Sequence, residues 1–216
     1  MFLLLRILAL LALAPAADAA AGQGRAADAS AWEIGPIIRS RNYSVGMPLR
    51  PTPDRAGWHF DFPYPSAAAG HVHALTFRHG SLAGARRLVV RYRIHAAPGT
   101  RFAPQESPEL PATLSLFFQR AGDSWSGRDR FETYRWYAPH ALVRELSPGV
   151  HEVSVPLNEA WISVQGRTAA ELPAEFQAAI EQADRVGFVL GSRIARGHGV
   201  YATGPARFTL LSFQVV

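Results

Sequence analysis

The sequence predicts an all-β protein, an antiparallel β-sandwich with one short α-helix. Three observations support this. Apolar and polar residues alternate along many short runs, as they do in strands that bury one face. Turn-forming residues separate those runs. Only one segment has helical periodicity, and a single helix cannot supply the repeated crossovers that a parallel sheet needs. Antiparallel strands stacked in two layers are therefore the simplest solution.

The clearest strand lies around residue 91. Leu88, Val90 and Tyr92 point to one side, whereas Arg91 and Arg93 point to the other. The predicted strands lie at 58–62, 71–77, 88–94, 114–118, 131–137, 150–157, 186–190 and 207–215. The turns between strands contain Pro98-Gly99, Gly122-Asp123, Pro148-Gly149 and Gly204-Pro205.

The one helix is predicted near residues 170–183. Phe176, Ala179 and Ile180 recur at helical spacing. Thr168 and Glu171 fit a capping box, and Pro173 is compatible with a slightly later start.

The N-terminus predicts export. Arg6 precedes a short apolar stretch, and Ala17-Asp18-Ala19 fits a cleavage site. We therefore expect a signal peptide at 1–21, a flexible segment at 22–30 and a single β-sandwich domain at 31–216. The mature protein is expected to be periplasmic or secreted, with no stable membrane span after cleavage of the signal peptide.

The composition excludes several kinds of chemistry. The chain has no Cys, so disulfides, thiol nucleophiles and Cys-ligated metals are excluded. It has no Lys, so a phosphate-loop lysine and Schiff-base chemistry are excluded as well. The net charge of +5 suits acidic partners such as uronic polysaccharides, but the arginines are scattered. No nucleic-acid partner is expected, because there is no Arg-dense helix or RNA-binding motif.

The segment 125–140 is the richest in aromatic and charged residues. A strand at 131–137 would place Glu132, Tyr134 and Trp136 on one face and Arg135 and Tyr137 on the other. Aromatic rings can cover the C–H faces of sugars while charged groups bind hydroxyls. The alternative is that Trp136 or Tyr137 merely fills the core. The candidate ligand-binding residues are Trp125, Arg128, Glu132, Tyr134, Arg135, Trp136, Tyr137, His140 and, from the glycine-rich segment 197–205, His198 and Tyr201.

A histidine pair suggests a metal site as an alternative to an ordinary strand. His71 and His73 share one side of a predicted strand, and His59 and Asp61 share one side of the preceding strand. If those strands paired, the four side chains would suit a transition metal. No other cofactor is expected.

Enzymatic signatures are incomplete, and no catalytic residue is assigned. Gly122-Asp123-Ser124 resembles the nucleophile segment of GDS hydrolases, but the Asp-x-x-His pair is missing. The Glu-x-Asp-x-x-Glu pattern of sandwich glycosidases is missing too. A polysaccharide lyase remains open, because Tyr134, Arg135, Tyr137 and His140 include the acid–base groups that it needs.

The order of the strand motifs resembles the galactose-binding-like jelly-roll superfamily. This superfamily includes carbohydrate-binding modules and the complex I intermediate-associated protein family. The motifs are Phe60-Asp61-Phe62-Pro63, 88–94, 114–118, Arg135-Trp136-Tyr137, Val155-Pro156-Leu157, Val186-Gly187-Phe188 and 208–215. The resemblance implies a jelly roll that binds sugars or proteins, often without catalysis. A structural calcium site recurs in the superfamily, but no dense acidic loop marks one here.

Together these observations predict an exported, non-catalytic binding protein for a carbohydrate or another cell-envelope glycan. Two alternatives remain open. One is a lyase-like or metal-dependent enzyme on the same sandwich. The other is a structural or assembly module that binds a protein through an exposed apolar patch.

Overall fold

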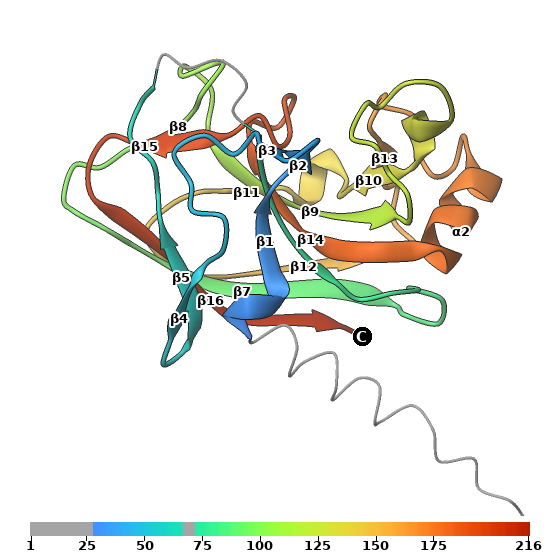
Figure 1. Cartoon of the computed structure of the whole chain (residues 1–216), viewed down its shortest axis with the longest axis horizontal. Coiled ribbons are helices and arrows are strands. Elements are labelled where there is room, and N and C mark those ends of the chain that lie inside the picture. Colours follow the sequence, from blue (N-terminus) through green and yellow to red (C-terminus); the bar gives the residue numbers. More distant parts are fainter. Residues whose placement is uncertain (1–27, 67–71) are drawn as a thin grey trace, which may run out of the picture.

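The computed structural model describes residues 28–66 and 72–216 and confirms the predicted β-sandwich. Two antiparallel sheets are stacked face to face (Figure 1). The larger sheet has the order β1 (Trp32–Gly35), β6 (His73–Arg78), β14 (Ala183–Gly191), β9 (Thr113–Arg120), β10 (Arg135–Tyr137) and β13 (Ile162–Ser163), and β11 (Arg144–Glu145) also pairs with β9. The smaller sheet has the order β12 (Gly149–Pro156), β7 (Arg87–Ala96), β16 (Ala206–Val215), β5 (Gly57–Asp61) and β4 (Thr52–Asp54).

Smaller elements close the ends of the sandwich. The described residues form two short strand pairs, β8 (Phe102–Pro104) with β15 (Val200–Ala202), and β2 (Ile37–Ile38) with β3 (Arg41–Asn42). The α-helix α2 (Pro173–Glu181) and the 3-10 helices Ala29–Ala31, Asp129–Thr133 and His140–Leu142 complete the described elements. In Figure 1, α2 and the β8–β15 pair lie at opposite ends of the molecule.

Aromatic rings from both sheets meet in the core. Trp32 on β1 packs against Trp58 on β5, with their ring centroids 4.8 Å apart. Phe188 on β14 packs against Phe208 on β16 at 5.2 Å. These four side chains are fully buried. Because the chain has no disulfides, this packing holds the two layers together.

The two sheets differ in how their outer faces are covered. Strand β7 alternates between buried and more exposed residues, as expected when one face meets solvent. In β9, by contrast, Thr113 to Gln119 are all buried. The larger sheet is therefore covered on both faces, and the cover of its outer face forms the candidate site described below.

The predicted capping box forms, but it does not cap the helix, which is shorter than predicted. The Thr168 backbone N–H donates to the Glu171 carboxylate at 2.7 Å, and the Glu171 N–H donates to the Thr168 hydroxyl at 3.3 Å. This capping box closes a turn of its own, and α2 begins only at Pro173, whose fixed φ suits the first helical position. Phe176 then packs against Trp136, 4.9 Å between ring centroids.

The predicted strand at 131–137 is wrong over most of its length. Residues Asp129–Thr133 form a 3-10 helix, and only Arg135–Tyr137 pair with β9. The physical reason is local hydrogen bonding. The Phe131 N–H donates to the Arg128 carbonyl at 3.0 Å, and the Tyr134 N–H donates to the Phe131 carbonyl at 3.3 Å. Face alternation therefore applies only from Arg135 onward.

Some predictions fall outside the described residues. The signal peptide at 1–21, most of the segment 22–30 and His71 lie there. Within the described part of the chain, no helix is both long and apolar enough to cross a membrane.

We predict that Trp32→Ala lowers the free energy of unfolding by about 3–5 kcal/mol, because it leaves a cavity among buried rings. Urea denaturation followed by circular dichroism measures this change. Tyr64→Ala is the control, because Tyr64 is 60% exposed and its removal should change stability by less than about 0.5 kcal/mol. Equal stability of both variants would show that β1 is not part of the core.

Candidate functional site

A second apolar cluster lies on the outer face of the larger sheet. It consists of Ala74, Phe117, Tyr137 and Val189, all buried, and Trp125 packs against it. The rings of Phe117 and Tyr137 stack with centroids 5.7 Å apart. Because these side chains point away from the main core, other segments of the chain must cover them.

The cover leaves a groove with a volume of about 410 Å³. Tyr137 and Val189 from the sheet and Trp125 from the β9–β10 connection line it. Further lining comes from the β2–β3 region, the segment 162–166 and the β14–β15 loop, which spans residues 192–199. The groove therefore combines segments that are far apart in the sequence.

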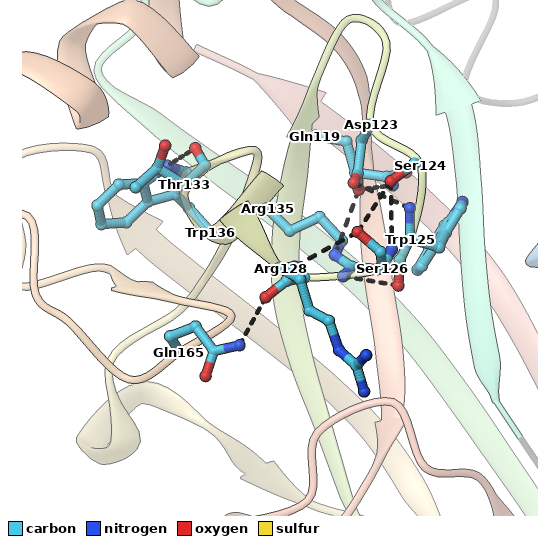
Figure 2. Close-up of polar contacts among 11 residues, drawn as sticks. Gln119, Asp123, Ser124, Trp125, Ser126, Arg128, Thr133, Arg135, Trp136 and Gln165 are labelled. Atoms are coloured by element: carbon cyan, nitrogen blue, oxygen red, sulfur yellow. Dashed lines mark hydrogen bonds and ion pairs between the residues drawn. The ribbon is translucent and has the colours of Figure 1, made fainter. Parts of the chain in front are cut away.

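A buried ion pair holds Trp125 beside the groove (Figure 2). Arg135 Nε lies 3.2 Å from Asp123 Oδ2, and the two side chains are only 5% and 2% exposed. Arg135 Nη2 also donates to the Trp125 carbonyl at 3.1 Å, and its guanidinium lies 4.7 Å from the centre of the Trp125 ring. One arginine thus fixes both the backbone and the ring of Trp125.

The turn that carries Trp125 has an uncommon backbone conformation. Trp125 has φ +65°, a value that bulky side chains rarely adopt. The Asp123 carboxylate compensates by accepting from the Trp125 N–H at 3.0 Å and from Gln119 Nε2 at 2.8 Å. Strained positions that the surrounding contacts maintain occur often at functional sites, which draws attention to Trp125.

The β14–β15 loop folds back tightly against the end of β14. A Cβ at Gly191 would lie 2.3 Å from the Ala195 carbonyl oxygen, so only glycine permits this approach. Ser192 Oγ accepts from the Ala195 N–H at 2.9 Å, and Gly197 turns the chain with φ +80°. This compact loop places Arg193, Ile194 and Arg196 along the groove.

The groove is strongly basic. Among the described residues that line it, three are arginines, two are histidines and none is Asp or Glu; the basic ones are Arg135, His140, Arg193, Arg196 and His198. Burial and the nearby charges of Arg196 and Arg193 lower the pKa of His140. Burial raises the pKa of Tyr137, so its phenol stays protonated at neutral pH.

Several predicted ligand-binding residues line this groove. They are Trp125, Arg135, Tyr137, His140 and His198. His198 Nδ1 also lies 2.8 Å from Glu106 Oε2 at the rim. The sequence does not show that these residues converge, because His198 lies in the β14–β15 loop and the other four lie within residues 125–140.

Other predicted ligand-binding residues lie elsewhere. Trp136 is 0% exposed in the main core and donates its indole N–H to the Thr133 carbonyl at 2.8 Å, so its prediction as an accessible ring is wrong (Figure 2). Arg128 and Glu132 are exposed but do not line the groove. Tyr134 lies under the Arg120 guanidinium, 4.7 Å from its ring centre, and Tyr201 is in β15 opposite Ala103.

The histidines proposed for a metal do not converge. His59 and Asp61 are on β5 in the smaller sheet, whereas His73 is on β6 in the larger sheet, so the two strands do not pair. Asp61 is held by Arg207 at 2.7 Å, and His73 Nδ1 accepts from the Val200 N–H at 3.1 Å. The described residues contain no group of three or more His, Asp or Glu placed to hold a metal, and His71 lies outside them.

Sequence reasoning missed Arg193, Ile194 and Arg196. Ile194 is 77% exposed at the rim, and both arginines line the groove. A usable signal was present: two arginines and an isoleucine lie between the glycines at 191 and 197, directly after a buried strand.

The comparisons with known proteins add little. No family model matches the chain, and no curated protein matches it. Among solved structures, it is similar to a candidate glycoside hydrolase from Bacteroides vulgatus ATCC 8482, with 13% sequence identity, 77% of each chain covered and a TM-score of 0.36. The resemblance to the galactose-binding-like superfamily stays a prediction.

We predict that Asp123→Asn lowers the free energy of unfolding by about 3–5 kcal/mol, because Arg135 would remain charged and buried without its partner. Urea denaturation measures the loss. Asp129→Asn is the matched control, because Asp129 is exposed, has φ +53°, which Asn tolerates, and forms no ion pair among the described residues. A loss below about 1 kcal/mol for Asp123→Asn would contradict a structural role for the pair.

We further predict that Arg196→Gln raises the pKa of His140. The charge of Arg196 helps to lower that pKa, and its removal makes the protonated imidazole less unfavourable. A titration of the His140 ring signals by NMR measures the shift. Arg91→Gln, an exposed arginine on β7, should leave the value unchanged. An unchanged pKa in Arg196→Gln would show that the two side chains are not electrostatically coupled.

Proposed function

We propose that this protein is an exported, non-catalytic carbohydrate-binding protein and that the groove on the outer face of the larger sheet holds the sugar. The observation that carries the proposal is the groove itself. It is about 410 Å³ in volume, and its lining includes Trp125, Tyr137 and charged donors such as Arg193. Clefts of this size that combine aromatic side chains with converging polar groups are typical of small-molecule recognition.

The lining matches the two surfaces of a sugar ring. The C–H face of a sugar packs on aromatic rings, and Trp125 and Tyr137 provide them. The hydroxyls need hydrogen-bond partners, and the guanidinium of Arg193 and the hydroxyls of Ser126 and Ser163 are along the same groove. Trp125 is fixed by Arg135, so the binding surface is already ordered, which lowers the entropy loss on binding.

The absence of catalysis is part of the proposal. Hydrolysis of a glycosidic bond generally uses two carboxylates, and the described lining of the groove contains none. A polysaccharide lyase can use Tyr, His and Arg instead of two carboxylates. The experiment below therefore also looks for the unsaturated products of a lyase. The predicted signal peptide would place the protein in the periplasm or outside the cell, where envelope glycans are available.

We predict that Trp125→Ala weakens glycan binding by about tenfold or more, equivalent to about 1.4 kcal/mol, because the stacking ring is lost. The measurement is a glycan array with neutral and acidic oligosaccharides, followed by calorimetry on the glycans that bind. Absorbance of unsaturated sugar products is recorded in the same samples.

Tyr64→Ala is the matched control, because Tyr64 is an exposed aromatic residue that does not line this groove. It should bind as the unmodified protein does, and thermal melting should show that both variants are folded. Absence of binding to any glycan, or equal binding by both variants, would overturn the proposal. Formation of unsaturated products would show instead that the protein is a lyase.

A further inference from the structure

Arg196 is a partly buried arginine whose charge has no partner among the described residues. Its Nε and Nη2 atoms are buried, and neither forms a hydrogen bond with that part of the chain. No ion pair involving Arg196 occurs among the described residues, and its guanidinium carbon lies 6.0 Å from the centre of the Tyr137 ring. Buried donors that lack acceptors are unusual in folded proteins and call for an explanation.

The other two arginines of the groove and His198 each have a carboxylate partner. Arg135 faces Asp123, Arg193 lies 3.9 Å from Glu145, and His198 lies 2.8 Å from Glu106. Arg193 also donates from Nη1 to the His140 carbonyl. Within the described lining, Arg196 is therefore the arginine that has no carboxylate partner.

The unpaired atoms form the edge of a guanidinium that suits a carboxylate. Nε and Nη2 lie side by side, so they can donate to two oxygens at once. The same edge of Arg207 binds both oxygens of Asp61, with distances of 2.7 and 3.0 Å. Arg196 can form the same pair of hydrogen bonds with the carboxylate of a ligand.

Burial of this charge is unfavourable in the absence of a partner. It lowers the pKa of Arg196 to about 10, so the side chain is still charged at neutral pH. An incoming anion would relieve that penalty, because it would supply the opposite charge that Arg196 lacks.

We infer that the groove binds a carbohydrate that carries a carboxylate, as uronic acids do, and that Arg196 holds this carboxylate. The inference rests on the proposed function, because the aromatic wall is what favours a sugar over a simple organic acid. In the bound arrangement, the sugar ring packs on Trp125 and its carboxylate faces the β14–β15 loop.

Access to Arg196 requires a small movement. Because Nε and Nη2 lie below the surface, the guanidinium must turn toward the groove to meet the carboxylate. This rotation breaks no hydrogen bond, since those atoms make none. Arginine has a long, flexible stem, so the change can take place within the side chain alone.

The experiment compares acidic oligosaccharides with neutral partners of the same backbone. The probes are oligomers of galacturonate, of mannuronate and of hyaluronan, each tested beside its carboxyl-reduced form, with a sulfated galactan as an anion that lacks carboxylates. Calorimetry is done with the full protein, Arg196→Gln and Arg91→Gln. Arg91 is an exposed arginine on the smaller sheet and controls for net charge.

We expect at least one uronate oligomer to bind about tenfold or more tightly than its reduced form. Arg196→Gln should remove that preference, with affinity for the acidic form falling about tenfold and affinity for the reduced form unchanged. Arg91→Gln should behave as the unmodified protein. Because Arg196→Gln removes an unpaired buried charge, its melting temperature should be equal or higher, which separates a binding role from a structural one.

The outcomes separate this inference from the proposed function. Three results would overturn the inference that Arg196 holds a carboxylate. They are equal binding of acidic and reduced forms, Arg196-dependent binding of the sulfated galactan alone, and no effect of Arg196→Gln. In each of these cases, a loss of binding in Trp125→Ala would still support a carbohydrate site. Binding of no probe and no array glycan would overturn both. A lower melting temperature of Arg196→Gln would show that Arg196 serves the fold.

Discussion

The packing of aromatic rings between two sheets is the interaction on which the rest of this structure depends. Trp32 and Phe188 from the larger sheet interlock with Trp58 and Phe208 from the smaller one. With no cysteine in the chain, no disulfide supplements this packing. The strands are thereby held in a fixed register, and β9, β10 and β14 present a defined outer face.

The apolar side chains on that outer face must be shielded from water, and the segments that shield them also form the candidate site. Phe117 and Tyr137 point outward from central strands and need cover. Trp125 and Val164 pack over them from turns, and the β14–β15 loop lines the groove beside them. The buried Asp123–Arg135 pair gives the Trp125 turn its shape. Because the cover is incomplete, an aromatic groove remains, and the residues that close the sheet also line it.

Electrostatics gives this groove its character. A buried ion pair such as Asp123–Arg135 contributes little net stability but fixes geometry, because breaking it leaves a charge unpaired. Arg196 is the opposite case, a partly buried charge with no partner within the described chain. Such an arrangement lowers stability, and proteins commonly carry features of this kind where they bind ligands. The contrast between the two arginines points to binding rather than folding as the role of Arg196.

Local sequence patterns determined the strands and the helix of this protein. Alternation at 88–94 and 150–157 and the capping box at Thr168 and Glu171 arise from neighbouring residues, so they could be predicted. The 3-10 helix at Asp129–Thr133 could not, because local backbone hydrogen bonds override the alternation there. Only the tertiary structure decided that Trp136 is buried and that Trp125 lines an open groove. Which ring is sealed and which lines a groove depends on segments far apart in the sequence, and no local pattern shows that Trp136 meets Phe176 or that Trp125 meets the β14–β15 loop.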